Sequence, residues 1–311
     1  MKATVGSGWG VLGSCSWVAE KSTLVTIDPA AVDRVAASLS DSTLREICSP
    51  AAFDADLHFI DSGPLTAQVV LVVDALNFCF WPDDELEYEH LARGVKAAVQ
   101  SDPECVSAAR LAAATVEDVR RLFGEWPREL PLEAERVRLL REVGTGLLRH
   151  YGGSAARLVE AAGGSAMALV ELVTHTFPGF RDATVYRGRQ VFLYKRAQIF
   201  VGDLYGAYGG VGLGAFRDMN EITMFADYRV PVVLRQLGIL VYSEALATQV
   251  AALKQIPSGS EQEAALVSVV LVALPLLVEV AVASVVEDLE MVEREVTAAP
   301  NGGGRCRVLF S

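Results

Sequence analysis

The chain has 311 residues, of which 51% are hydrophobic and 21% are charged, a composition that excludes intrinsic disorder and can build a sizeable core. Its net charge of −12 argues against duplex DNA or RNA as the main partner, because phosphate binding needs a basic face. The 5 cysteines show no CxxC spacing and the 4 histidines no HExxH spacing, so we predict neither a disulfide framework nor a bound metal.

Residues 1–28 are rich in Gly, Ser and Trp and have no clear period, which predicts an irregular N-terminal arm. The first 20 residues lack a basic start followed by an apolar block, so we expect no signal peptide and a cytoplasmic location. The first helix is expected after this arm, with Asp28 as its cap and Pro29 in its first turn.

Residues 67–80 form an apolar run that periodicity alone cannot assign to strand or buried helix, and at 14 residues we favour a helix. Its polar residues Asp74 and Asn77 are three apart and would share one face of that helix. The aromatic residues from Phe78 to Trp81 follow, and they would suit stacking against a base. The alternative is an ordinary aromatic core with satisfied polar neighbours.

The middle of the chain reads as a series of amphipathic helices with polar starts. Thr115 and Asp118 are spaced for a capping box. Helices are expected at residues 84–100, 115–123 and 132–150, and after the capping residues Ser154 and Ser165.

Residues 184–194 are the only predicted hairpin, with its turn at Arg187-Gly188-Arg189. A helix should follow from Lys195. Lys195 and Asp203 are eight apart and share a face, which the apolar flanks indicate is buried or at a cleft. The alternative is a solvated stripe of ion pairs.

The stretch Ile222–Val232 combines an apolar approach, a polar triplet and a new helix with Pro231 in its first turn. Asp227, Tyr228 and Arg229 lie at the mouth of that helix, where free N–H groups would favour a phosphate or a carboxylate. The alternative is that Asp227 only caps the helix and Arg229 only pairs with it.

Residues 264–278 carry no charge and could be taken for a membrane span. Pro275 interrupts the run, both flanks are acidic, and no Lys or Arg anchors either end, so we predict a buried central helix and no membrane partner. Residues 299–311 are expected to be a flexible tail. The whole chain, 1–311, is predicted to be a single compact domain, mainly α, with a small β-hairpin.

Several strings in this chain resemble the queuosine salvage family, the queuosine 5′-phosphate N-glycosylases/hydrolases, over roughly residues 55–250. The strings are His58-Phe-Ile-Asp61, Asn77-Phe-Cys-Phe-Trp81, Phe177-Pro-Gly-Phe-Arg-Asp182, Tyr194-Lys-Arg-Ala-Gln198 with Asp203, and Thr223-Met-Phe-Ala-Asp-Tyr-Arg-Val-Pro231. The resemblance implies a fold related to helix-hairpin-helix DNA glycosylases. It also implies release of the base queuine from queuosine 5′-monophosphate, a small nucleotide, without a metal or other cofactor.

The sequence departs from the family pattern in two places. Val232 stands where family members carry Gln, and the chain ends in Val308-Leu-Phe instead of a longer aromatic segment. The first 55 residues match weakly. These departures bear on fine substrate contacts.

The resemblance assigns roles according to what the ligand needs. Asp227 is the expected catalytic carboxylate, as nucleophile or as electrostatic stabiliser of positive charge on the ribose. Asp203 and Asp61 are candidates for the cationic arm of the base. The remaining substrate-binding candidates are the aromatic walls Phe59, Phe78, Trp81 and Phe192, the phosphate contacts Lys195, Arg229, Tyr228 and His58, and Asn77.

Two other functions stay open at this point. A DNA-lesion glycosylase on the same fold is disfavoured by the net charge of −12 and by the lack of a basic stripe. A non-catalytic helical protein that binds a modified base or nucleotide would keep the same residues without consuming its ligand. The sequence gives no oligomeric state.

Overall fold

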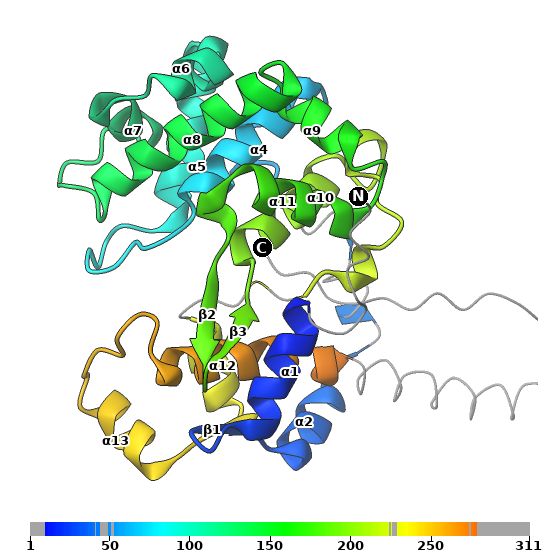
Figure 1. Ribbon diagram of the computed structural model, residues 1–311, viewed down its shortest axis with the longest axis vertical. Coiled ribbons are helices and arrows are strands. Elements are labelled where there is room, and N and C mark those ends of the chain that lie inside the picture. The colour runs from blue at the N-terminus through cyan, green and yellow to red at the C-terminus, as the bar shows by residue number, and fades with distance from the viewer. Residues whose placement is uncertain are drawn as a thin grey trace, which may run out of the picture. The chain divides into compact units, whose positions relative to one another are not determined.

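The computed structural model describes residues 10–40, 42–43, 49–50, 53–223, 225, 229–273 and 275–278. This part of the chain is mainly helical, with two small antiparallel sheets, as predicted for the fold class (Figure 1). The contacts divide the chain into two compact units. Unit 1 comprises Met1–Cys48, Asp182–Lys195 and Thr223–Phe310, and unit 2 comprises Ser49–Arg181 and Arg196–Ile222. The single domain over 1–311 stays a prediction.

Unit 2 is built around helix α4, Pro64–Leu76, in which every residue from Thr66 to Leu76 is buried. Helices α5, α8 and α9 pack against α4 (Figure 1), which explains why the run is apolar on all sides. The helices of this unit after α4 are α5 Tyr88–Ser101, α6 Ala108–Ala112, α7 Val116–Leu122, α8 Glu133–Tyr151, α9 Ala155–Ala161, α10 Ala166–Thr176 and α11 Lys195–Ala207, whose first residue belongs to unit 1. Its 3₁₀ helices are η2 Pro103–Val106, η3 Pro178–Phe180, η4 Gly212–Gly214 and η5 Met219–Glu221.

The predicted helix caps are present. The Thr115 hydroxyl accepts the Asp118 N–H at 3.3 Å, and the Asp118 carboxylate accepts the Thr115 N–H at 2.9 Å, so the capping box is confirmed. Ser154 and Ser165 likewise accept an N–H from the first turns of α9 and α10. These bonds satisfy donors that a helix leaves open at its start.

Helices α6 and α8 cross at Gly144, where there is no room for a side chain. A Cβ atom on Gly144 would lie 2.2 Å from the Ala112 backbone nitrogen and 2.5 Å from the Ala108 carbonyl oxygen. The glycine is therefore required by the close approach of two backbones.

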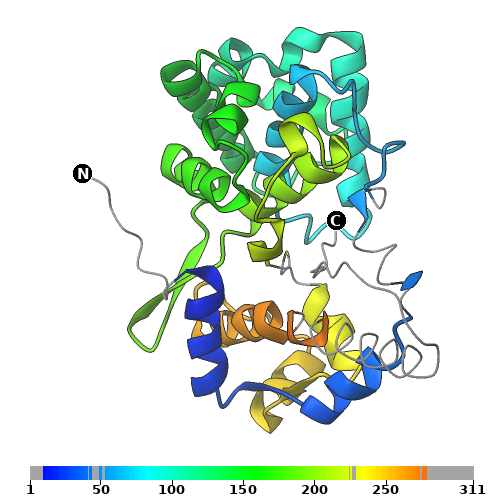
Figure 2. The same ribbon diagram turned by 90° about the vertical axis from the view of Figure 1, so that its right-hand side faces the viewer.

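Unit 1 has a second core, into which the apolar helix Glu261–Val278 packs together with α1, as Figure 2 shows for the orange and dark blue helices. The helix predicted for residues 264–278 is present, and most of its described residues are buried, although Leu276 is exposed. Within the described part of the chain it is also the one helix long and apolar enough to cross a membrane, with a mean hydropathy of 1.8. The other elements are α1 Val11–Lys21, β1 Val25–Ile27, α2 Pro29–Ala36, β2 Ala183–Tyr186, β3 Arg189–Phe192, α12 Val230–Gln236, β4 Leu240–Tyr242 and α13 Glu244–Ala251.

The prediction of an irregular arm over residues 1–28 is wrong for its second half. Residues 11–21 form α1, whose buried face includes the small residues Ser14 and Cys15 and so gives little hydrophobic contrast. Strand β1 pairs with β4, placing Val25 opposite Tyr242. This sheet was not predicted, because strands of three residues carry too short a pattern and their partner lies at the other end of the chain.

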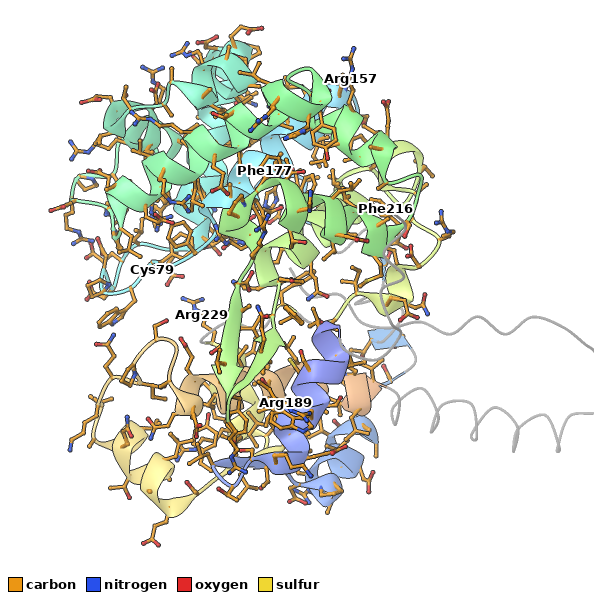
Figure 3. The ribbon with its side chains drawn as sticks, viewed as in Figure 1. Cys79, Arg157, Phe177, Arg189, Phe216 and Arg229 are labelled. Atoms are coloured by element: carbon orange, nitrogen blue, oxygen red, sulfur yellow. The ribbon has the colours of Figure 1, made fainter. Side chains whose placement is uncertain are left out.

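The predicted hairpin is confirmed, and its turn explains its register. Strands β2 and β3 are joined by Arg187 and Gly188, with φ of 46° and 78°. Two successive residues with positive φ form a turn whose twist matches antiparallel strands. Figure 3 shows Arg189 beside α1, where its guanidinium lies 4.8 Å from the centre of the Trp17 ring.

Candidate functional site

Two carboxyl groups meet inside unit 2. Asp74 on α4 is fully buried and Asp203 on α11 is 6% exposed, and the two carboxyl groups interact. Burial raises the pKa of Asp203 to about 7, and the interaction with Asp74 only partly opposes this. Two interacting buried carboxyls resist ionising together, so Asp203 binds a proton at a higher pH than an exposed aspartate does. Each residue was noted in the sequence, but their pairing was not predicted.

Tyr88 and His58 extend this polar cluster. The charges of Asp203 and Asp74 add to burial in raising the pKa of the Tyr88 phenol. The His58 Nε2 atom lies 2.7 Å from the Tyr88 oxygen, and its Nδ1 lies 2.7 Å from the carbonyl oxygen of Asp54. Burial lowers the pKa of His58, so the imidazole is neutral at neutral pH. Both ring nitrogens are engaged, which leaves His58 poorly suited to a phosphate.

Asp61 has a structural partner of its own at the start of α4. Its Oδ1 accepts the Thr66 hydroxyl at 2.7 Å and the Gly63 N–H at 2.8 Å. The Thr66 hydroxyl in turn accepts the Asp61 N–H at 2.9 Å. Asp61 therefore caps the first turn of α4 although it stands before the helix. Phe59, two residues earlier, is partly buried.

The segment Asn77–Trp81 leaves α4 with an unusual backbone. The prediction that Asn77 continues the helix beside Asp74 is wrong: Asn77 has φ −76° and ψ 68°, and the Phe78 N–H donates to the Leu76 carbonyl at 2.9 Å. This is an inverse γ-turn. Cys79, labelled in Figure 3, then takes a positive φ of 48°. Trp81 is 60% exposed, so its ring is open to a ligand.

A buried arginine that the sequence analysis missed holds this segment. Arg136 on α8 is 0% exposed, yet it retains its charge, because burial lowers its pKa only to about 10. It donates to the carbonyl oxygens of Leu76 at 2.7 Å and of Phe78 and Cys79 at 2.8 Å each. A charged residue in an amphipathic helix is expected to be exposed. The one sequence signal for Arg136 is that no capping glycine follows α4, so other groups must bind the last carbonyls of that helix.

Phe78 lies against two guanidinium groups. Those of Arg136 and Arg196 are 4.5 Å and 5.0 Å from the centre of its ring. Arg196, in the first turn of α11, also donates to the Ala75 carbonyl at 2.7 Å and to the Gly179 carbonyl. These contacts hold the Phe78 ring within unit 2. Its role as a substrate contact stays a prediction, for which only the part of the ring not covered by the two guanidinium groups would serve.

In unit 1, Asp182 organises the start of α11. Its carboxylate accepts the Lys195 N–H at 2.8 Å, and its carbonyl accepts the N–H groups of Leu193 and Tyr194 at 3.1 Å. Lys195 is the first residue of α11 and is partly buried. Phe192 packs against the Tyr194 ring with centroids 5.4 Å apart.

The polar triplet before α12 is only partly described. Asp227 and Tyr228 lie outside the described residues, and Arg229 is the exposed residue that precedes the helix. Pro231 is in the first turn, as predicted. The helix ends at Gln236, and the chain then turns into β4. Helix α12 has only seven residues, so we assign no anion-binding site to its N-terminus.

The structure thus brings some predicted residues together within each unit. His58 and Asp203 share the cluster around Tyr88, and Asn77, Phe78 and Trp81 share one segment. Among the described residues, no group of three or more His, Cys, Asp and Glu side chains could hold a metal ion. The absence of a metal from the reaction stays a prediction.

The sequence of this chain matches a known protein family. Residues 57–298 match the family described as "Queuosine salvage protein". A Dictyostelium discoideum protein named "Queuosine 5′-phosphate N-glycosylase/hydrolase" is 52% identical over 199 residues, which cover 64% of this chain and 61% of that protein's length.

Two further relatives bear the same name and are matched over more of their length. The Sphaerobacter thermophilus protein is 42% identical over 84% of this chain and 82% of its own length. The Bos taurus protein is 35% identical over 80% of this chain and 78% of its own length. The similarity therefore extends beyond a single conserved segment and includes both units.

Proposed function

Because the chain belongs to the queuosine salvage protein family, we propose that it hydrolyses the N-glycosidic bond of queuosine 5′-monophosphate and releases the base queuine for salvage. The observation that carries the proposal is the similarity to the Sphaerobacter thermophilus protein over most of both chains, since that protein is named for this activity. The Dictyostelium discoideum relative, of which the chain spans less than two thirds, supports the same reaction.

The chemistry needs a fixed negative charge near the ribose. Queuosine is a 7-deazaguanosine, so the base cannot be expelled by protonating N7. The bond must break with positive charge developing at C1′ and O4′, which a carboxylate in an apolar site stabilises. Asp227 takes this role in the proposal, as nucleophile or as electrostatic stabiliser. The apolar residue Phe225, buried two positions earlier, is in keeping with such a surrounding.

Asp203 is the better candidate for the cationic arm of the base. The Asp61 carboxylate is engaged in capping α4, whereas Asp203 and Asp74 form a buried pair that loses its proton only near neutral pH. A cation that approached this pair would favour loss of the proton.

The 5′-phosphate is assigned to cationic side chains. Lys195 and Arg229 are proposed to bind it, with Tyr228 as a hydrogen-bond donor, because the imidazole of His58 is neutral and both its nitrogens are engaged. Phe59, Trp81 and Phe192 are proposed as walls for the base. A cytoplasmic location, the lack of a nucleic-acid partner and the relation to helix-hairpin-helix DNA glycosylases remain predictions.

The test is an incubation followed by mass spectrometry with three substrates: queuosine 5′-monophosphate, queuosine, and guanosine 5′-monophosphate. We expect release of queuine from the first and little release from the other two. No release from any substrate by folded protein would refute the proposed reaction. Binding of queuosine 5′-monophosphate without turnover would instead indicate a non-catalytic binding protein.

A further inference from the structure

The backbone conformation of Asn77–Trp81 is not maintained by contacts within the segment. The helix ends at Leu76 and passes through an inverse γ-turn to Cys79, whose left-handed conformation is one that L-residues adopt rarely. Such conformations persist only where surrounding contacts determine them, and they concentrate at ligand sites. Within the segment, the Cys79 thiol donates to the Trp81 carbonyl at 3.3 Å, a weak bond that cannot maintain the shape alone.

Arg136 supplies the missing contacts. Its Nη1 and Nη2 groups bind the carbonyls of Leu76, Phe78 and Cys79, and its Nε binds the Pro131 carbonyl at 2.9 Å. The guanidinium also faces an aromatic cage, 4.5 to 5.7 Å from the ring centres of Phe78, Phe123 and Phe80. One residue thereby fixes three successive features of the segment: the helix end, the γ-turn and the left-handed residue.

This arrangement goes beyond what a helix end requires. Most helices end with a glycine or with water on their last carbonyls, at little cost. Arg136 is instead a fully buried charge, and no carboxylate among the described residues forms an ion pair with it. Burying a charge against neutral carbonyls and rings is expensive, so its presence indicates that the geometry of this segment matters.

We propose that Arg136 is a positioning residue that holds Asn77–Trp81 in the shape needed to contact the base of the substrate. This inference rests on the proposed function and adds a residue that does not touch the substrate. Trp81 is the expected contact, because it is 60% exposed at the end of the held segment. The forked guanidinium is essential to the role, since a lysine carries the same charge but cannot reach three carbonyls in one plane.

The primary test compares Arg136→Lys with the wild-type enzyme in steady state. We expect KM for queuosine 5′-monophosphate to rise about tenfold while kcat changes by less than about threefold. Inhibition by the product queuine should weaken in parallel, whereas inhibition by ribose 5-phosphate should stay the same. Hydrogen exchange should accelerate at the amides of residues 77–81, which reports the segment without any turnover.

Arg141 offers a matched control on the same helix. Its Nε donates to the Ala114 carbonyl at 2.8 Å, beyond the end of α6, and it has no contact with residues 77–81. Arg141→Lys should accelerate exchange near residue 114 and leave KM and queuine inhibition unchanged. Arg136→Met serves as a second variant, and Arg136→Lys keeps the test valid if the methionine variant does not fold.

The outcomes separate this inference from the proposed function. If wild-type protein releases no queuine, the proposed function fails. The role of Arg136 is then decided by comparing wild type and Arg136→Lys in hydrogen exchange at residues 77–81 and in queuine affinity measured by calorimetry. Faster exchange at 77–81 with unchanged KM and queuine affinity would overturn the positioning role and leave a purely structural arginine. Equal losses in the Arg136 and Arg141 variants would overturn it as well.

Discussion

The carboxyl groups of Asp74 and Asp203 interact in the interior of unit 2, from helices that are more than a hundred residues apart in the chain. Two buried carboxyls that interact resist carrying two negative charges, because neither charge is hydrated. Water cannot screen the pair, so desolvation outweighs the effect of Asp74, and the pKa of Asp203 rises to about 7.

This pair predicts a stability that falls as the pH rises. The folded-state pKa of Asp203, about 7, is above its ordinary value of 3.8, so between these values the folded protein binds more protons than the unfolded chain. The contribution is fully present below pH 3.8 and is lost as the pH rises through 7. Each pH unit in this window changes the free energy of unfolding by up to about 1.4 kcal/mol.

Asp203→Asn should remove this dependence, since an amide does not titrate. Urea unfolding at pH 5 and pH 8 should therefore show the variant gaining stability relative to wild type at the higher pH. The exposed Asp56→Asn variant is the control and should follow wild type at both pH values. An Asp203→Asn variant that also follows wild type would show that the pKa of Asp203 is not raised in the folded protein.

The fold was predictable where local patterns were strong. The apolar run of α4, the caps at Thr115 and Ser165 and the hairpin turn at Gly188 are all determined by residues close in sequence. The β1–β4 sheet was not predictable, because each strand has three residues and their pairing is set by packing between distant parts of the chain.

The site was predictable as a set of residues but not as an arrangement. Asp74 and Asp203 each interrupt an apolar segment, yet nothing local shows that these interruptions meet. Arg136 escaped notice because its neighbours on α8 are other charged residues that are exposed, such as Arg138. The γ-turn at Asn77 depends on that arginine. The sequence pattern alone therefore predicted that the helix continues at Asn77, where the chain leaves it.

Lys195→Ala should separate binding of the phosphate from binding of the base. If Lys195 binds the 5′-phosphate, its loss should raise KM for queuosine 5′-monophosphate by roughly 10- to 100-fold. The KM for the nucleoside queuosine should change by less than about threefold, because it has no phosphate. The exposed Lys254→Ala variant should behave as wild type with both substrates. Equal effects of Lys195→Ala on both substrates would exclude the phosphate role.

Gly144→Ala should destabilise unit 2 although alanine favours helices. The gain in helix propensity is about 1 kcal/mol, but the new Cβ would overlap the backbone of α6, 2.2 Å from the Ala112 nitrogen. Forcing two packed backbones apart costs roughly 2–3 kcal/mol or more, so the clash should win. Thermal unfolding checks this result. Gly10→Ala is the control and should change stability little, because no atom lies within 4 Å of the added Cβ. An unchanged unfolding temperature for Gly144→Ala would mean that the backbones of α6 and α8 are not so close.

Asp227→Asn should abolish turnover with little effect on folding. The amide keeps the size of the side chain but removes the charge, so the oxocarbenium-like transition state loses its counter-charge and kcat should fall by about a thousandfold or more. Binding of queuosine 5′-monophosphate, measured by calorimetry, should change far less than kcat, because the positive charge on the ribose develops only in the transition state. The exposed Glu221→Gln variant controls for loss of a nearby acid. Near-normal turnover by a folded Asp227→Asn protein would move the catalytic role elsewhere, and the pair of Asp74 and Asp203 would then be the first carboxyls to replace.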